Sequence, residues 1–138
     1  MIKVKYYYND DFSLKGFCLK GHADFAEIGY DIVCSAVTSN AIAVINSLDK
    51  LVKVEFEKVV GQAGHIECIV KDTYLDESQL LLNHFQLAIE GIKREYPKNI
   101  KILKFWILST KLLNLLFYTA SCSKYACNFN SLCSLFEL

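Results

Sequence analysis

The sequence has no excess of charge of either sign. Its 15 lysine and arginine residues balance 15 aspartate and glutamate residues, and these charges are scattered rather than gathered in blocks. A protein without a strong net field has no general attraction to nucleic acid or to anionic lipid. We therefore expect neither a direct nucleic-acid partner nor a membrane among its partners.

The six cysteines lack the spacing of a metal or redox site. No two of them form a Cys-x-x-Cys pair, the usual arrangement in zinc and thiol-disulfide centres. The first residues show no long apolar run with a small-residue cleavage site, so we expect no secretory signal peptide. Reduced thiols fit this pattern, and we predict a cytoplasmic protein with no metal and no other cofactor.

Long hydrophobic runs are also missing, although one segment comes close. Residues 105–120 are strongly apolar but are interrupted by Lys111 and Asn114, and a membrane-spanning helix needs about 18 or more apolar residues. This segment belongs to a C-terminal stretch, 103–138, that has no glycine, no proline and one acidic residue, Glu137. We interpret 103–138 as an atypical tail, appended or out-of-frame, with a membrane span as the alternative.

The rest of the sequence has the composition of a globular domain. The chain of 138 residues is 53% hydrophobic and 22% charged, which suits one domain with a single core. Apolar residues alternate with polar ones in several short segments, the period of a half-buried strand. The predicted strands are residues 2–8, 14–20, 52–56, 66–70 and, as a short fifth strand, 100–102.

Two amphipathic helices separate these strands. Asp31 is placed as the N-cap of the first helix, and Asp76 with Gln79 resembles a capping box before the second, which Pro97 ends. Their apolar faces follow three- and four-residue steps. The first face comprises Val33, Val37, Ala41, Val44, Leu48 and Leu51, and the second Leu81, Phe85, Ala88, Ile92 and Tyr96.

The resulting order, ββαββα(β), contains hairpins rather than βαβ repeats. It predicts an α+β two-layer sandwich, in which two helices cover one face of a mostly antiparallel sheet. We place the boundary of this domain at residues 1–102.

Three residues of this fold are candidates for chemistry: His22 after the second strand, Asp31, and Cys34 in the first turn of the first helix. The helix dipole and unpaired N–H groups favour thiolate at that position, and a nearby imidazole would activate it. The amides near Cys34 and Ser35 are candidates for an oxyanion hole.

Each of these residues also has a plainer interpretation. A free cysteine is commonly a small buried residue, as we expect for Cys18 and Cys68 on their strands. Asp31 can be only a helix cap, or it can also orient His22. We expect His65 and His84 at the surface or at the edge of the core. A zinc site at Cys34 would have only three clustered ligands at no common spacing.

Residues 21–36 add a more specific signal. The triplet Gly21-His22-Ala23 is followed, after a short loop, by the tetrapeptide Asp31-Ile32-Val33-Cys34. This paired motif resembles the signature of the ribosomal-processing cysteine proteases. The resemblance covers about residues 1–102, including the segment Glu95–Ile100.

The resemblance implies a homodimeric endopeptidase that removes a short N-terminal extension from large ribosomal subunit protein twenty-seven. Cys34 would be the nucleophile and His22 the general base, with Asp31, Ser35 and Thr38 in support. Thr38 stands where many relatives carry serine, and it keeps the hydroxyl. A substrate loop would cover the site, with Asp24, Phe25, Ile28, Gly29 and Tyr30 as its contact residues.

A second class of function stays open at this point. The same fold could serve as a non-enzymatic module that binds a ribosomal protein or an assembly intermediate. Such a module has no need for a reactive thiol, so selective alkylation of Cys34 over Cys18 and Cys68 at neutral pH distinguishes the two classes.

Overall fold

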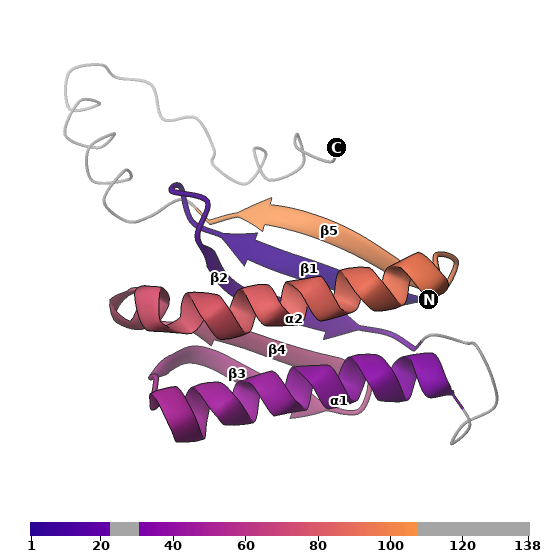
Figure 1. Ribbon diagram of the computed structural model, residues 1–138, viewed down its shortest axis with the longest axis horizontal. Coiled ribbons are helices and arrows are strands. Elements are labelled where there is room, and N and C mark those ends of the chain that lie inside the picture. The colour runs from indigo at the N-terminus through magenta and orange to yellow at the C-terminus, as the bar shows by residue number, and fades with distance from the viewer. Residues whose placement is uncertain (23–30, 108–138) are drawn as a thin grey trace, which may run out of the picture. The chain divides into compact units, whose positions relative to one another are not determined.

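The computed structural model describes residues 1–22 and 31–107, and their elements follow the order ββαββαβ (Figure 1). This order agrees with the predicted one, and the described residues of 1–107 belong to one compact unit. The strands are β1 (Ile2–Tyr8), β2 (Leu14–Lys20), β3 (Phe56–Gln62), β4 (His65–Val70) and β5 (Ile100–Trp106). The helices are α1 (Ile32–Ser47), a π-helical turn (Leu48–Val52), a 3-10 turn (Asp72–Tyr74) and α2 (Leu75–Glu95).

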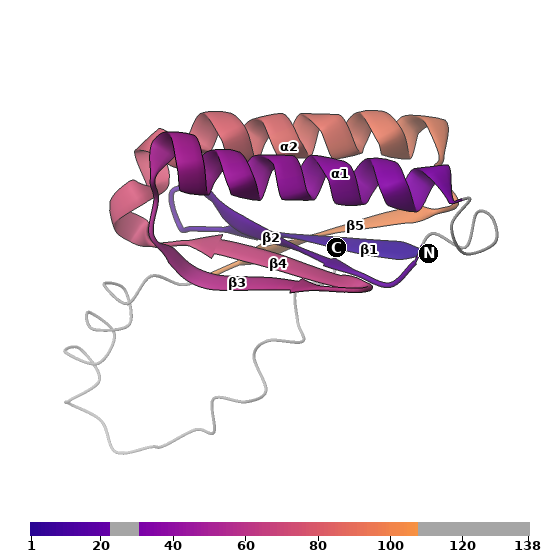
Figure 2. The ribbon, with the colours of Figure 1, turned by 90° about the horizontal axis from the view of Figure 1, so that it is seen from below.

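The five strands form one sheet in the order β3-β4-β2-β1-β5. Every neighbouring pair is antiparallel except β1 and β5, which run parallel. Figure 2 shows α1 and α2 side by side on one face of this sheet. The predicted α+β sandwich, with two helices on one face of a mostly antiparallel sheet, is therefore confirmed.

The core lies between the helices and the sheet. Tyr6, Phe17 and Phe85 are fully buried there, and the rings of Phe17 and Phe85 stack with centroids 3.9 Å apart. The predicted apolar face of α1 is confirmed at every position but its last. Leu51 is 77% exposed, because the π-helical turn moves it out of the stripe.

The strand predicted at 52–56 is largely wrong. The π-helical turn extends through Val52 and closes on Lys53, whose φ of 61° is left-handed. Val54 then packs into the core, and β3 begins only at Phe56. The alternation of Val52, Val54 and Phe56 therefore marks a chain that leaves a helix and enters the core.

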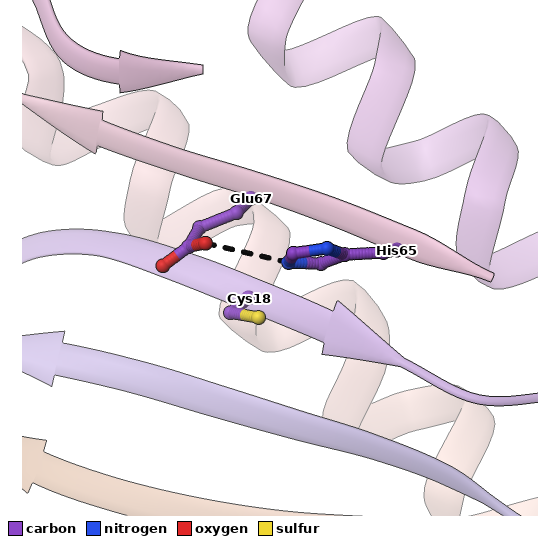
Figure 3. A group of neighbouring side chains, drawn as sticks. All are labelled: Cys18, His65 and Glu67. Atoms are coloured by element: carbon purple, nitrogen blue, oxygen red, sulfur yellow. Dashed lines mark ion pairs between the residues drawn. The ribbon is translucent and has the colours of Figure 1, made fainter. Parts of the chain in front are cut away.

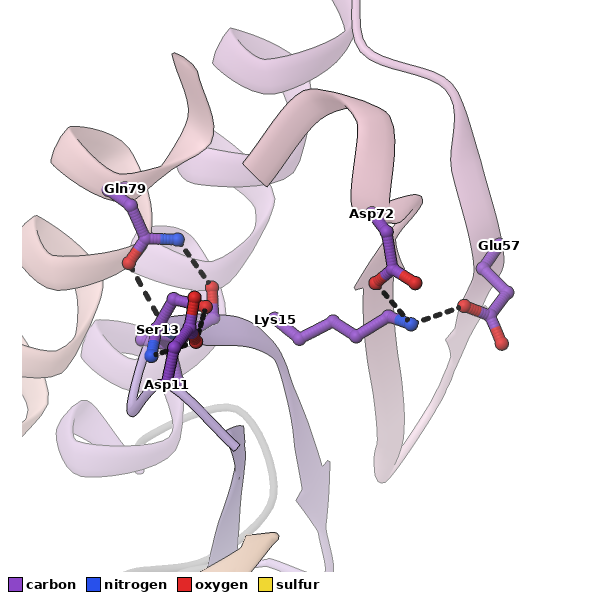
Figure 4. Close-up of polar contacts among 7 residues, drawn as sticks. Asp11, Ser13, Lys15, Glu57, Asp72 and Gln79 are labelled. Carbon is purple, nitrogen blue, oxygen red and sulfur yellow. Dashed lines mark hydrogen bonds and ion pairs between the residues drawn. The ribbon is translucent and has the colours of Figure 1, made fainter. Parts of the chain in front are cut away.

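The capping box at Asp76 and Gln79 is also wrong, because α2 begins at Leu75 and has no side-chain cap. Gln79 instead ties α2 to β2 (Figure 4): its amide donates to the Leu14 carbonyl at 2.9 Å and accepts from the Leu14 N–H at 3.1 Å. Lys15, which follows Leu14 on β2, is buried and forms ion pairs with Glu57 at 2.9 Å and with Asp72 at 2.8 Å.

The last strand is longer than predicted. It continues past residue 102 to Trp106, whose ring stacks on Tyr8 with centroids 5.9 Å apart. The N–H of Ile107 then donates to the Tyr8 carbonyl at 2.7 Å. Residues 103–107 therefore complete the sheet, and 108–138 lie outside the described residues.

One helical stretch in the described part of the chain, Ile32–Val52, is long and apolar enough to cross a membrane by length and composition alone. It consists of α1 and the π-helical turn that follows. Val33, Val37, Ala41 and Val44 on its buried face pack against the sheet. This is the composition expected of a core helix.

Candidate active site

Cys34 lies in the first turn of α1, as predicted. Asp31 precedes the helix in an extended conformation, and its carboxylate accepts a hydrogen bond from the Cys34 N–H at 2.8 Å. The predicted N-cap is therefore confirmed. The cap places the Cys34 thiol at the N-terminal end of α1, where the helix dipole is positive.

The two amides expected to form an oxyanion hole are not free. The Cys34 N–H is bonded to the Asp31 side chain, and the Ser35 N–H donates to the Asp31 carbonyl at 3.0 Å. The Ser35 side chain itself is exposed. Stabilisation of an oxyanion by these amides would require one of the two bonds to open.

The Cys34 side chain is partly exposed at the wall of a small pocket. Thr38, one helical turn further along α1, lines the same pocket, so the structure brings these two predicted residues together. Apolar side chains and two glycines form most of the wall. The other lining residues are Ile2, Leu19, Gly21, Val37, Gly64, His65 and Ile66.

His22 is exposed and lies just beyond the end of β2. Its ring packs directly over Gly64: a Cβ added to that glycine would lie 2.9 Å from the His22 Nε2 atom. Gly21 and Gly64 both have positive φ, and the Gly21 N–H donates to the Gly64 carbonyl at 3.0 Å. The turn between β3 and β4 therefore holds the backbone beside His22.

Because both glycines line the Cys34 pocket, His22 stands at its edge. Among the described residues, the structure shows no hydrogen bond between the Cys34 thiol and the His22 ring. Catalytic hydrogen bonds often tighten only when substrate is bound. Proton transfer between the two residues would therefore follow a closing movement.

Cys18 and Cys68 differ from Cys34 in their surroundings. Both are buried, as predicted, whereas Cys34 is partly exposed. Burial raises the pKa of Cys68 to about 12, and burial together with the Glu67 carboxylate raises the pKa of Cys18. Cys34 is therefore the most accessible of the three described thiols.

Gly64 is a residue of the site that the sequence did not predict. His65 is half-buried at the start of β4, as expected for the edge of the core, and it also lines the pocket, whereas His84 is exposed on α2. The pairing of Lys20 with His65 brings the start of β4 to the end of β2. No local pattern in the sequence predicts that pairing.

The residues of the predicted substrate loop lie in 23–30, outside the described residues. They are Asp24, Phe25, Ile28, Gly29 and Tyr30.

Known proteins similar to this chain agree on one family. Residues 1–101 match the family described as "Cysteine protease Prp". The ribosomal processing cysteine protease Prp of Staphylococcus aureus is 30% identical over 103 residues, covering 74% of this chain and 97% of that protein. The protein of the same name from Bacillus subtilis is 29% identical over 107 residues, covering 74% and 96% of the two chains.

Solved structures agree with the sequences. The S. aureus protease Prp in complex with a covalently linked product peptide matches with a TM-score of 0.70 and 29% identity, over 76% of this chain and 100% of that one. Its complex with a substrate peptide matches with a TM-score of 0.67 and 28% identity over the same shares. Since family, relatives and fold agree, the chain belongs to the family of the cysteine protease Prp and is a cysteine protease.

Proposed function

We propose that this protease removes a short N-terminal extension from large ribosomal subunit protein twenty-seven during ribosome assembly. The observation that carries the proposal is the position of Cys34: a partly exposed thiol, at a helix N-terminus, in the wall of a pocket. The names of the relatives support ribosomal processing. The motif Gly21-His22-Ala23 with Asp31–Cys34 supports this particular substrate.

The reaction that this geometry supports is acyl transfer. The Cys34 thiolate attacks the scissile carbonyl, so that a carbon–sulfur bond forms and the carbon–nitrogen bond breaks. Protonated His22 gives its proton to the leaving amine, and neutral His22 then takes a proton from the water that hydrolyses the thioester. The covalently linked product peptide in the S. aureus relative supports a covalent route.

Asp31 and Thr38 would have supporting roles. The Asp31 cap fixes the first turn of α1 and therefore the direction of the Cys34 side chain. Thr38 brings a hydroxyl to the apolar wall of the pocket, one turn from the thiol. We propose that substrate packs on this wall.

The test is cleavage of the organism's own ribosomal protein, read from product masses. We expect one cut after the N-terminal extension, no product with the Cys34→Ala variant, and normal cleavage with the matched Cys68→Ala variant. Proteolysis by a well-folded Cys34→Ala protein would refute the nucleophile. Uncut ribosomal protein, with a thiol that still reacts selectively at Cys34, would refute the substrate but not the protease.

We further propose that the protein acts as a cytoplasmic homodimer. Light scattering of the purified full chain measures the mass of the assembly directly. A monomer mass at the concentrations that support cleavage would contradict the dimer.

A further inference from the structure

A second group of reactive side chains lies on the face of the sheet away from the helices. Cys18 on β2 is paired with Glu67 on β4, and His65 stands two residues before Glu67. Side chains alternate along a strand, and the neighbours Leu19 and Cys68 belong to the core under the helices. Figure 3 shows Cys18, His65 and Glu67 gathered over these two adjacent strands.

The distances within this group suit a metal ion. The thiol sulfur, an imidazole nitrogen and a carboxylate oxygen all lie within 4.8 Å of one another, and His65 Nε2 is 3.3 Å from Glu67 Oε2. Nitrogen and oxygen ligands at the corners of a tetrahedral zinc site are about 3.3 Å apart, and sulfur lies about 3.6 Å from either. The nitrogen and oxygen atoms therefore already have the separation that zinc requires, and the sulfur needs a shift of at most about 1.2 Å.

The Nε2 atom of His65 is buried and has no hydrogen-bond partner among the described residues. It contacts the Glu67 carboxylate at ion-pair distance, 3.3 Å from Oε2. Buried polar atoms usually have a partner, so this nitrogen is suited to accept a ligand.

Glu67 is oriented by its neighbours. The Tyr7 hydroxyl donates to its Oε1 atom at 3.0 Å, and this leaves Oε2 facing His65. Such a hydrogen bond from outside the coordination sphere fixes a metal-binding carboxylate. Lys58 Nζ also contacts Oε2 at 2.8 Å, but the Lys58 side chain is 51% exposed and can turn into solvent when a divalent cation replaces it.

We propose that Cys18, His65 and Glu67 form a binding site for a zinc-class divalent cation, with one coordination position left for water. Sulfur, nitrogen and oxygen ligands together are the set that zinc prefers. The Cys18 proton leaves as the metal binds, since thiolate is the ligand. The sequence predicted no metal, because Cys18 lies far from His65 and Glu67 along the chain and the three ligands meet only through strand pairing.

The test is a titration of the reduced full chain with Co²⁺, a spectroscopic substitute for Zn²⁺. Thiolate coordination to Co²⁺ gives a near-ultraviolet charge-transfer band, which added Zn²⁺ should remove. We expect the band to persist in Cys34→Ser and Cys68→Ala and to disappear in Cys18→Ser. His65→Ala and Glu67→Gln should weaken Co²⁺ binding at least about tenfold, as for other perturbed metal sites.

Three results would overturn the site: no band in the full chain, a band of equal affinity in Cys18→Ser, or loss of the band in Cys34→Ser. The last result would assign the metal to the catalytic thiol. Circular dichroism checks that each variant folds. If Cys18→Ser does not fold, the Co²⁺ affinity of Glu67→Gln is the test, because glutamine has the same shape and can still accept a hydrogen bond from Tyr7. Unchanged Co²⁺ affinity in that variant would then overturn the site.

Discussion

The contact between His22 and Gly64 gives the sharpest prediction, which is the effect of Gly64→Ala. The added methyl group would lie 2.9 Å from Nε2, 3.5 Å from Cε1 and 3.7 Å from Cδ2 of the His22 ring. Contact at 2.9 Å is too short, so the ring must move by about 0.5–1 Å, and a displacement of about 1 Å near a reacting group can cost about 100-fold in rate. We expect kcat/KM to fall about 10- to 100-fold.

The same substitution also has a cost in stability. Gly64 has a φ of 72°, where a residue with a Cβ costs about 1–2 kcal/mol. In a domain of this size, each kcal/mol lowers Tm by about 4–8 °C. Two variants separate this strain from the contact with His22. Gly64→Asn tolerates a positive φ but still carries a Cβ, and the Cβ of Gly61→Ala in the same hairpin meets nothing within 4 Å.

The assay is kcat/KM on the ribosomal substrate, together with the pH profile of Cys34 alkylation and Tm. We expect Gly64→Asn to regain most of the Tm but not the activity, and Gly61→Ala to keep both. Values of kcat/KM within about twofold of the unchanged protein for both Gly64→Ala and Gly64→Asn would show that the turn does not position His22.

Three further predictions concern other parts of the domain. His22→Ala should lower turnover by about 10²–10⁴-fold and slow the alkylation of Cys34 at neutral pH; normal cleavage by this variant would show that His22 is not the general base. Asp31→Ala should lower the free energy of unfolding by about 1 kcal/mol, whereas Asp31→Asn keeps the cap. A tenfold loss of kcat/KM in a well-folded Asp31→Asn protein would show that the carboxylate does more than cap the helix. A chain ending at Ile107 should fold and cleave like the full chain. A chain ending at residue 102 should have a lower Tm, because it loses the stacking of Trp106 on Tyr8. If the chain ending at Ile107 does not fold, residues 108–138 are an integral part of the domain.

Local chemistry made much of this molecule predictable. Alternation identified β1 and β2, and a single aspartate before an apolar-periodic run located the start of α1. Both signals depend only on neighbouring residues, and Cys34 could be placed in the first helical turn for the same reason.

What could not be predicted depends on contacts between distant segments. Gln79 looked like part of a capping box, but a partner on β2 uses its amide. The π-helical turn after Ser47 likewise depends on the packing of Val54 in the core, and it leaves Leu51 exposed. The pocket residues Gly64 and His65 reach the site only through the pairing of β4 with β2.

The parallel pairing of β1 with β5 has a consequence for how the protein folds. Ile2 is paired with Ile100, so the edge strand β5 is synthesised almost a full domain later than its partner β1. Contacts that distant in sequence form slowly, and until then one edge of β1 has unpaired N–H and carbonyl groups. During synthesis, the sheet of β1 to β4 therefore exposes an unpaired edge to which other chains can bind. We expect aggregation to compete with folding until β5 has been synthesised as far as Trp106.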